Sequence, residues 1–311
     1  MSVWLRPFIS ALERFEPDVY LIPHGYAGVT SQFLENAGEY DAKYTDYDHW
    51  RLLLENALSR LLDLGGRMEI LDLGSGAGNS VVPVLEMFPE AHIVATDISP
   101  QLLSMLRRRL VERGLADRAL LVSVDLCEDH LEPESFDLVV GGSILHHLLD
   151  PAALLRRVCS WLRPARYAVF FEPFALGSLF LALVYERLIA ERAALGLSEQ
   201  VVDLFRRIAT DIRVRMARPP DVFPHLDDKW IFTPRFFEEA VSGLCEVRID
   251  PINTAPEPLT HKTKQLLMTV LSAPESALPA PAWEVLRSSD AMLGDVRREA
   301  FMEACVTLRR P

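Results

Sequence analysis

The chain has 311 residues, of which half are apolar and 24% are charged, and its formal net charge is −12. A chain of this length can bury a sizeable core in one large domain or in two smaller ones. The acidic balance argues against a nucleic-acid partner, because neutralising phosphates requires an excess of Lys and Arg.

The cysteines and the apolar segments limit the possible compartments. The four cysteines are far apart and form no CxxC pair, so we predict no zinc site and no other metal site. Isolated cysteines fit a reducing compartment, and residues 1–20 contain no long apolar run, so we expect a cytoplasmic protein. The most apolar stretch, residues 174–190, is interrupted by Glu186 and Arg187, and we expect no membrane span.

Helix-like and strand-like stretches alternate through the first half of the chain. Helical spacing predicts helices at 50–63, 79–88, 99–114 and 151–164, and short apolar runs predict strands at 68–73, 92–98, 119–126, 136–145 and 167–173. This alternation is typical of an α/β protein with a doubly wound, mostly parallel sheet that is covered by helices on both faces.

The alternation stops near residue 175 and resumes later. Residues 175–218 look helical throughout, and a proline-rich stretch follows at 217–225. We then expect a helix at 233–244, strands at 245–252 and 264–272, and a last amphipathic helix at about 283–308. The expected regions are an N-terminal helical segment (1–50), an α/β core (51–175), a helical insert (176–232), and the closing strands and C-terminal helix of the core (233–311).

The stretch "ILDLGSGAGN" (70–79) places a glycine turn directly after the first core strand. A dinucleotide fingerprint has the form G-x-G-x-x-G, but Asn79 stands where its third glycine would be. Asp72, just before the turn, would repel a pyrophosphate and attract a cationic group such as an ammonium. The alternative is that the glycines only make a tight turn between strand and helix.

Two further carboxylates follow the next strands. Asp97 ends the second strand, where a carboxylate can accept both hydroxyls of a ribose, and Asp125 follows the third, where it can accept from an adenine amine. Together with Asp72 they imply a ligand with an amino-acid end, a ribose and an adenine, and no phosphate. The alternative roles are a strand-end cap for Asp97 and a loop carboxylate for Asp125.

The motifs "ILDLGSGAGN", "TDIS" (96–99), "SVDL" (123–126) and "SILHHLLDP" (143–151) occur in the order seen in class I S-adenosylmethionine-dependent methyltransferases, which this sequence resembles over about residues 40–175 and the closing strands. The resemblance implies a seven-stranded Rossmann-like methyltransferase fold and S-adenosylmethionine as cofactor, with S-adenosylhomocysteine as product. It also implies that the N-terminal segment, residues 1–50, forms a lid over the cofactor through the aromatic stretch at 39–51. The alternative is that this stretch is an amphipathic helix whose aromatic side chains pack on the domain. The cofactor-binding residues that the resemblance implies are Tyr40, Tyr44, Asp72, Gly74, Ser75, Gly76, Asp97, Ile98, Asp125, Leu126, Gly142 and Ser143.

The catalytic candidates lie where the fourth and fifth strands end. His146 and His147 could accept a proton from the methyl acceptor, although one of them could instead pack against the following helix. Glu172 could orient an acceptor hydroxyl or amine, or could instead cap the next helix. A carboxylate acceptor would need no base.

The helical insert is expected to select the acceptor. Its helix at 178–197 is apolar on more than one face, so it could line an apolar pocket or form a homodimer interface. Most of the arginines in 201–220 should face solvent, while one or two could turn inward and pair with an acidic substrate group.

We therefore expect O-methylation of a small, fairly hydrophobic molecule at a hydroxyl or carboxylate. The alternatives are N- or C-methylation, a rearrangement or cyclisation assisted by the bound sulfonium, and a binding module with little catalysis.

Overall fold

A mixed sheet of nine strands lies at the centre of the computed structural model, which describes residues 7–26, 29, 34–62, 64–252 and 255–311. The strand order is β1-β2-β5-β4-β3-β6-β7-β9-β8. Neighbouring strands from β2 to β7 are parallel, whereas β1 is antiparallel to β2 and β9 is antiparallel to both β7 and β8. The bounds are β1 (Glu13–Glu16), β2 (Val19–Leu21), β3 (Glu69–Leu73), β4 (His92–Asp97), β5 (Ala119–Ser123), β6 (Phe136–Gly142), β7 (Leu162–Pro173), β8 (Glu246–Pro251) and β9 (Glu303–Arg309).

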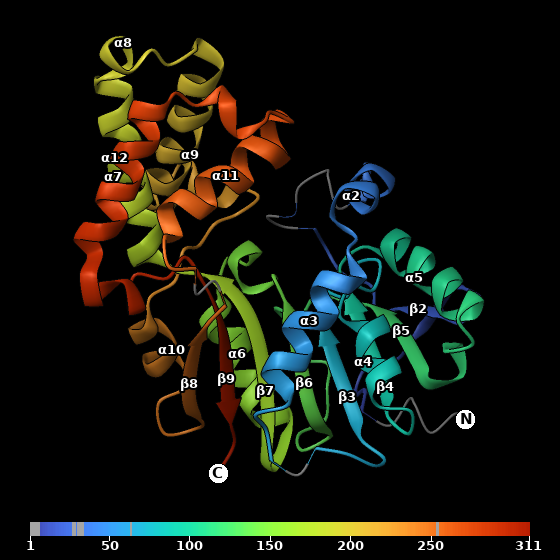
Figure 1. Cartoon of the computed structure of the whole chain (residues 1–311). Helices are drawn as coiled ribbons and strands as arrows, with labels where there is room; N and C mark the ends of the chain where they lie inside the picture. The colour runs from blue at the N-terminus through green and yellow to red at the C-terminus, as the bar shows by residue number, and fades with distance from the viewer. Residues whose placement is uncertain (1–6, 27–28, 30–33, 63, 253–254) are drawn as a thin grey trace.

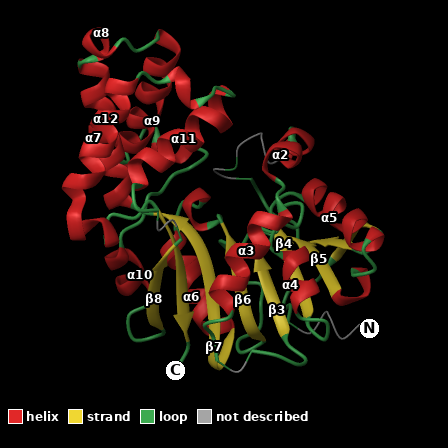
Figure 2. Ribbon diagram, in the orientation of Figure 1, coloured by secondary structure: helices red, strands yellow, loops and turns green. Residues whose placement is uncertain are grey.

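Helices cover both faces of this sheet, as the alternation predicted (Figure 2). Side chains that alternate along the central strands are buried on both faces, which explains why these strands read as continuous apolar runs. One face packs against α3 (Tyr47–Leu58), α4 (Val81–Met87) and α5 (Pro100–Glu112), and the other packs against α6 (Pro151–Trp161) and α10 (Pro234–Ala240).

The expected helix start at Ser99 is confirmed. Its hydroxyl accepts a hydrogen bond from the N–H of Leu102, and Pro100 occupies the first helical position of α5.

A layer of helices stands over the carboxyl edge of the sheet and forms a cap (Figure 1). Its helices share one apolar core, which is separate from the two cores that flank the sheet. They are α7 (Ala175–Ala190), α8 (Arg192–Leu195), α9 (Glu199–Ala217), α11 (Pro258–Leu271) and α12 (Ala280–Leu293). Among the described residues, no helix combines the length and the apolar composition that a bilayer crossing requires.

Two expectations for the C-terminal region were wrong. Residues 264–272 are not a closing strand but part of α11, in which Leu259, Thr263 and Leu267 recur at a helical spacing of four and are buried. Residues 283–308 are not one helix, because α12 ends at Leu293 and the last segment forms β9. Helices α11 and α12 pack in the cap core and not on the sheet, so within 233–311 the elements that belong to the α/β core are α10, β8 and β9.

The N-terminal segment also differs from the expected helical lid. It contributes the short strands β1 and β2, and β2 extends the parallel sheet beside β5, before it continues into α2 (Ala37–Tyr44). The apolar residue Val19 is fully buried in this position, so the extension protects an otherwise open edge of the sheet. The sheet therefore has nine strands, not the expected seven.

The contact between α7 and the segment before β9 gives a test of the fold. A Cβ at Gly177 would lie 2.3 Å from the carbonyl oxygen of Ala300 and 2.6 Å from the carbonyl carbon of Phe301. Alanine should stabilise an exposed helix position by about 1 kcal/mol. Here we expect Gly177→Ala to lower the free energy of unfolding by about 1–3 kcal/mol, because backbone atoms cannot yield.

Urea denaturation measures this change. Gly25→Ala is the matched control, because no described residue lies within 4 Å of the added Cβ, and its stability should stay close to that of the wild type. A Gly177→Ala variant as stable as the wild type would contradict the close packing of the cap on the C-terminal segment.

Candidate functional site

Three adjoining cavities lie at the carboxyl edge of the parallel strands, where the strand order reverses between β4, β3 and β6. We call them the edge cavity (about 140 Å³, lined by Asp97 and Asp125), the turn cavity (about 160 Å³, beside Ser75) and the cap cavity (about 470 Å³, between Glu172 and Leu181). Ser143 lines all three, so they meet at the end of β6.

The structure brings most of the predicted cofactor-binding residues together. Those that line the edge cavity, the turn cavity or both are Tyr40, Tyr44, Gly74, Ser75, Gly76, Asp97, Ile98, Asp125, Leu126, Gly142 and Ser143. Asp72 is the exception, because its side chain is fully buried in β3 and lines none of the three cavities.

Asp72 is nevertheless an unusual buried carboxylate. In the part of the chain that the structure describes, neither of its oxygens has a hydrogen-bond partner. Burial raises the pKa of Asp72 to about 7, and the nearby hydroxyls of Ser75 and Ser80 offset only part of this effect. An unpaired buried carboxylate next to the turn favours a positively charged group in the adjoining cavity.

Asp97 is tied to the glycine turn by its own carboxylate. One oxygen accepts from the N–H of Gly76 and the other from the N–H of Ser99, both at 2.8 Å. Burial raises the pKa of Asp97 to about 6, although these backbone donors work in the opposite direction. Each oxygen keeps a second lone-pair position, so the side chain can still accept from a ligand in the edge cavity.

The turn itself requires glycine at its first position. Gly74 has φ = 67°, and a Cβ there would lie 2.7 Å from the side chain of Ile144. The turn after β3 therefore passes close to the end of β6. This path keeps the backbone N–H groups of the turn at the rim of the edge and turn cavities.

Helix α2 is held over the turn by contacts that the sequence did not reveal. The Asn79 side chain accepts from the N–H of Asp46 at 3.0 Å and donates to the carbonyl of Tyr44 at 2.9 Å. Arg109 on α5 makes two hydrogen bonds to Asp41, at 2.7 and 2.6 Å, and donates to the carbonyl of Ala77 at 3.0 Å. These contacts place Tyr40 and Tyr44 at the rims of the cavities.

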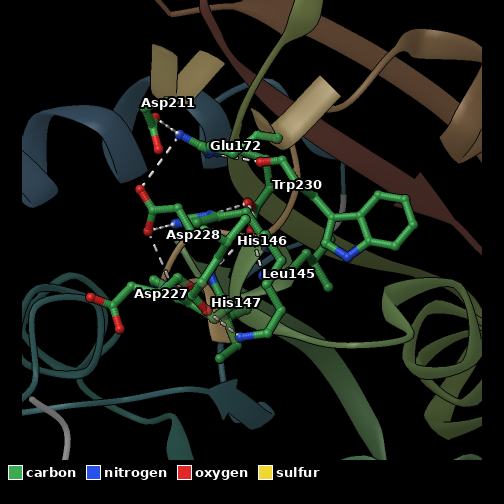
Figure 3. A network of polar contacts seen from close by, with 12 residues as sticks. Leu145, His146, His147, Glu172, Asp211, Asp227, Asp228 and Trp230 are labelled. Atoms are coloured by element: carbon green, nitrogen blue, oxygen red, sulfur yellow. Dashed lines mark hydrogen bonds and ion pairs between the residues drawn. The ribbon is translucent and has the colours of Figure 1, made fainter. Parts of the chain in front are cut away.

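The two predicted histidines face different cavities. His146 and Glu172 line the cap cavity, whereas His147 lines the edge cavity. Glu172 Oε2 lies 2.6 Å from His146 Nδ1, and its carboxylate accepts from the N–H groups of Ile144, Leu145 and His146. Glu172 thus fixes the orientation of the His146 ring and does not cap the next helix through a side-chain bond (Figure 3).

Asp228, in the connection after α9, joins this network (Figure 3), and Arg215 of α9 extends it into the cap. Asp228 Oδ1 lies 3.5 Å from His146 Nε2, and its Oδ2 lies 3.5 Å from Arg215 of α9. Arg215 also reaches Asp211 at 3.2 Å and donates to the carbonyl of Trp230 at 2.7 Å. Arg215 is therefore an arginine of the insert that turns inward, as the sequence analysis allowed.

Charge and burial set the protonation of these groups. Burial opposes a charged imidazole at His146, but Glu172 and Asp228 outweigh it and raise the pKa of His146 to about 9. Burial and the neighbouring His146 lower the pKa of His147 to about 3. Burial opposes ionisation of Asp228, but His146 and Arg215 hold the pKa of its carboxyl below the ordinary value.

The cap cavity is apolar over most of its wall. The aromatic rings of Trp50 and Phe171 pack edge to face, with centroids 5.6 Å apart, and both line this cavity. The sequence analysis identified neither Trp50 nor Asp228 as a site residue. Leu181, considered for a dimer interface, is buried within the cap of the same chain, whereas Leu183 is exposed.

Part of this chain is similar in sequence to known proteins. Residues 71–165 match a family model described as a methyltransferase domain. An uncharacterised protein of Synechococcus sp. is 36% identical over 112 residues, which are 36% of this chain and 27% of that protein. The malonyl-[acyl-carrier protein] O-methyltransferase of Acetivibrio thermocellus is 29% identical over 133 residues, 42% of this chain and 44% of that protein.

The fold extends further than the sequence similarity. The crystal structure of the [4+2]-cyclase SpnF superposes with a TM-score of 0.52 at 15% identity, and covers 84% of this chain and 81% of that one. The chain spans less than half the length of these two curated relatives. Residues 71–165, which carry the glycine turn, Asp97 and Asp125, are therefore similar to a methyltransferase domain.

Proposed function

We propose that this protein is an S-adenosylmethionine-dependent methyltransferase that methylates an oxygen of a small, largely apolar molecule. The observation that carries the proposal is the meeting of three cavities at Ser143. The edge and turn cavities suit the cofactor, and the larger cap cavity suits the acceptor. An apolar cavity with a few convergent polar groups is the usual form of a small-molecule site.

The residues present fit the cofactor. The carboxylate of Asp72, which has no hydrogen-bond partner among the described residues, directly precedes the glycine turn, where it would favour the ammonium and sulfonium groups of the cofactor. Asp97 would accept from the ribose hydroxyls through its remaining lone pairs, and Asp125 with Leu126 would hold the adenine. Tyr40, Tyr44, Ile98 and Gly142 would enclose the ligand, and α2 would act as the lid over it.

The bound cofactor would supply an electrophilic methyl group on a good leaving group. The main task of the chain is then to hold the acceptor oxygen in line with that methyl and to exclude water. Trp50, Phe171 and Leu181 would hold the apolar body of the acceptor. His146, oriented by Glu172, would face its oxygen, while His147 lies on the cofactor side of the junction.

A prediction about pH follows from these carboxylates. Asp97 and Asp72 have pKa values of about 6 and about 7 in the free protein, so both carboxyls ionise as the pH rises through this range. The cationic cofactor binds better to the ionised form. Calorimetry should therefore show the Kd of S-adenosylmethionine falling at least tenfold between pH 5.5 and 7.5.

The Asp97→Asn variant is the control for this titration. It should bind more weakly at pH 7.5 and show a shallower pH dependence, because one of the two titrating groups is gone. A Kd that stays constant over this pH range in the wild type would contradict the assignment of these carboxylates to the cofactor.

A further prediction tests the reaction class. The enzyme should form one S-adenosylhomocysteine for each methylated acceptor in a panel of apolar alcohols, carboxylic acids and amines. Glu172→Gln should lower kcat about 10²-fold or more, because His146 loses the carboxylate that orients its ring, and it should leave the Kd of the cofactor unchanged. Mass spectrometry measures the amounts of S-adenosylhomocysteine and of methylated product, and calorimetry measures the Kd of the cofactor.

The products also separate the alternatives. Turnover of an acceptor without S-adenosylhomocysteine would favour a rearrangement or cyclisation, the class to which the structural neighbour SpnF belongs by name. Methylation confined to amines or carbon acceptors would replace the oxygen assignment and keep the cofactor.

A further inference from the structure

We propose that His146, His147 and Asp228 bind a divalent transition-metal ion of the zinc class at the junction of the edge and cap cavities. One nitrogen of each imidazole and one oxygen of Asp228 lie within 4.8 Å of one another. Asp228 Oδ1 is 3.5 Å from His146 Nε2 and 3.5 Å from His147 Nδ1. His147 Nδ1 donates to the carbonyl of Asp227 at 2.9 Å. Loss of that bond and modest side-chain movement would bring the three atoms to bonding distance of one ion.

Glu172 holds His146 as a metal-binding histidine is usually held. Metal-ligating histidines generally donate their second ring N–H to a carboxylate or a carbonyl, which fixes the tautomer and the ring orientation. The bond between Glu172 Oε2 and His146 Nδ1, at 2.6 Å, leaves Nε2 directed at Asp228. Glu172 is itself fully buried and anchored by three backbone N–H groups, so this orientation is rigid.

The charges of the cluster leave room for a cation. Its carboxylates are Glu172, Asp211 and Asp228, and its permanent positive charge is that of Arg215. Lys229 and Asp227, next along the chain, add one charge of each sign. With both imidazoles neutral, as metal ligands must be, the carboxylates outnumber the cations by two, and one divalent ion would balance them.

The surroundings would leave coordination positions open. His146 and Asp228 line the cap cavity and His147 lines the edge cavity, so water or an acceptor atom could complete the coordination sphere. The Asp228 side chain is 45% exposed and can adjust its position. Two imidazoles with one carboxylate favour Zn²⁺ or Co²⁺ over Mg²⁺ and Ca²⁺, which prefer oxygen ligands.

The use of this ion in catalysis rests on the proposed function, but the site itself does not. An acceptor hydroxyl bound to the ion would have a lowered pKa and would lose its proton to bulk water before its oxygen takes the methyl group. Neither histidine would then have to act as the proton acceptor. The sequence could not predict this site, because Asp228 comes from the connection after α9, far along the chain from the two histidines.

Cobalt titration of the metal-free full-length protein tests the site directly. We expect one equivalent of Co²⁺ to bind with a visible absorption band of low coordination number, and Zn²⁺ to displace it. Asp228→Asn should weaken Co²⁺ binding at least tenfold. Asp211→Asn is the matched control, because it also removes one carboxylate beside Arg215 but no ligand, and it should retain the band.

Further variants keep the test decisive. His147→Gln should alter the band even if Asp228→Asn folds poorly, which circular dichroism would show. Calorimetry with S-adenosylmethionine on the same samples monitors the proposed function separately, and cofactor binding should persist without metal. Failure of Co²⁺ to bind the wild type, or equal weakening by Asp211→Asn and Asp228→Asn, would overturn the proposal and indicate charge attraction or an adventitious ion only.

Discussion

Buried negative charge at the carboxyl edge of the parallel sheet is the constraint on which the rest of the site depends. Asp72 has no hydrogen-bond partner among the described residues, and Asp97 is held by two backbone N–H groups of the turns around it. Burying carboxylates in this way is costly unless a cationic ligand compensates for them. The same strands that bury these groups also place them at the switch point, where ligands of doubly wound sheets bind.

Polar contacts connect the cap to the edge of the sheet. Its helices come from two separate stretches of chain, on either side of α10 and β8, and they close around one shared core. Arg215 and Asp228 connect this layer to His146 and Glu172 at the sheet edge, so a single polar network joins the acceptor side to the strand ends (Figure 3). The arrangement couples the position of the cap to the orientation of the candidate catalytic ring.

Local sequence was sufficient to predict the part of the site that lies at the ends of consecutive strands. The carboxyl ends of β3 to β6 must meet at one edge, so the sequence alone could place Asp97, Asp125 and Ser143 together. It was insufficient for α11, whose short apolar run fits a strand as well as a helix, and for β9, whose partners are far away in the chain. Asn79 and Asp228 were missed for the same reason, since their roles depend on contacts with distant segments.

The central claim is that this edge receives a cationic nucleoside and not a diphosphate-bearing coenzyme. Isothermal titration calorimetry of the purified protein with S-adenosylmethionine and, separately, with NAD⁺ tests it most directly. The account predicts a 1:1 complex with S-adenosylmethionine at neutral pH and at least hundredfold weaker binding of NAD⁺. Equal or tighter binding of NAD⁺, or no binding of S-adenosylmethionine, would contradict it.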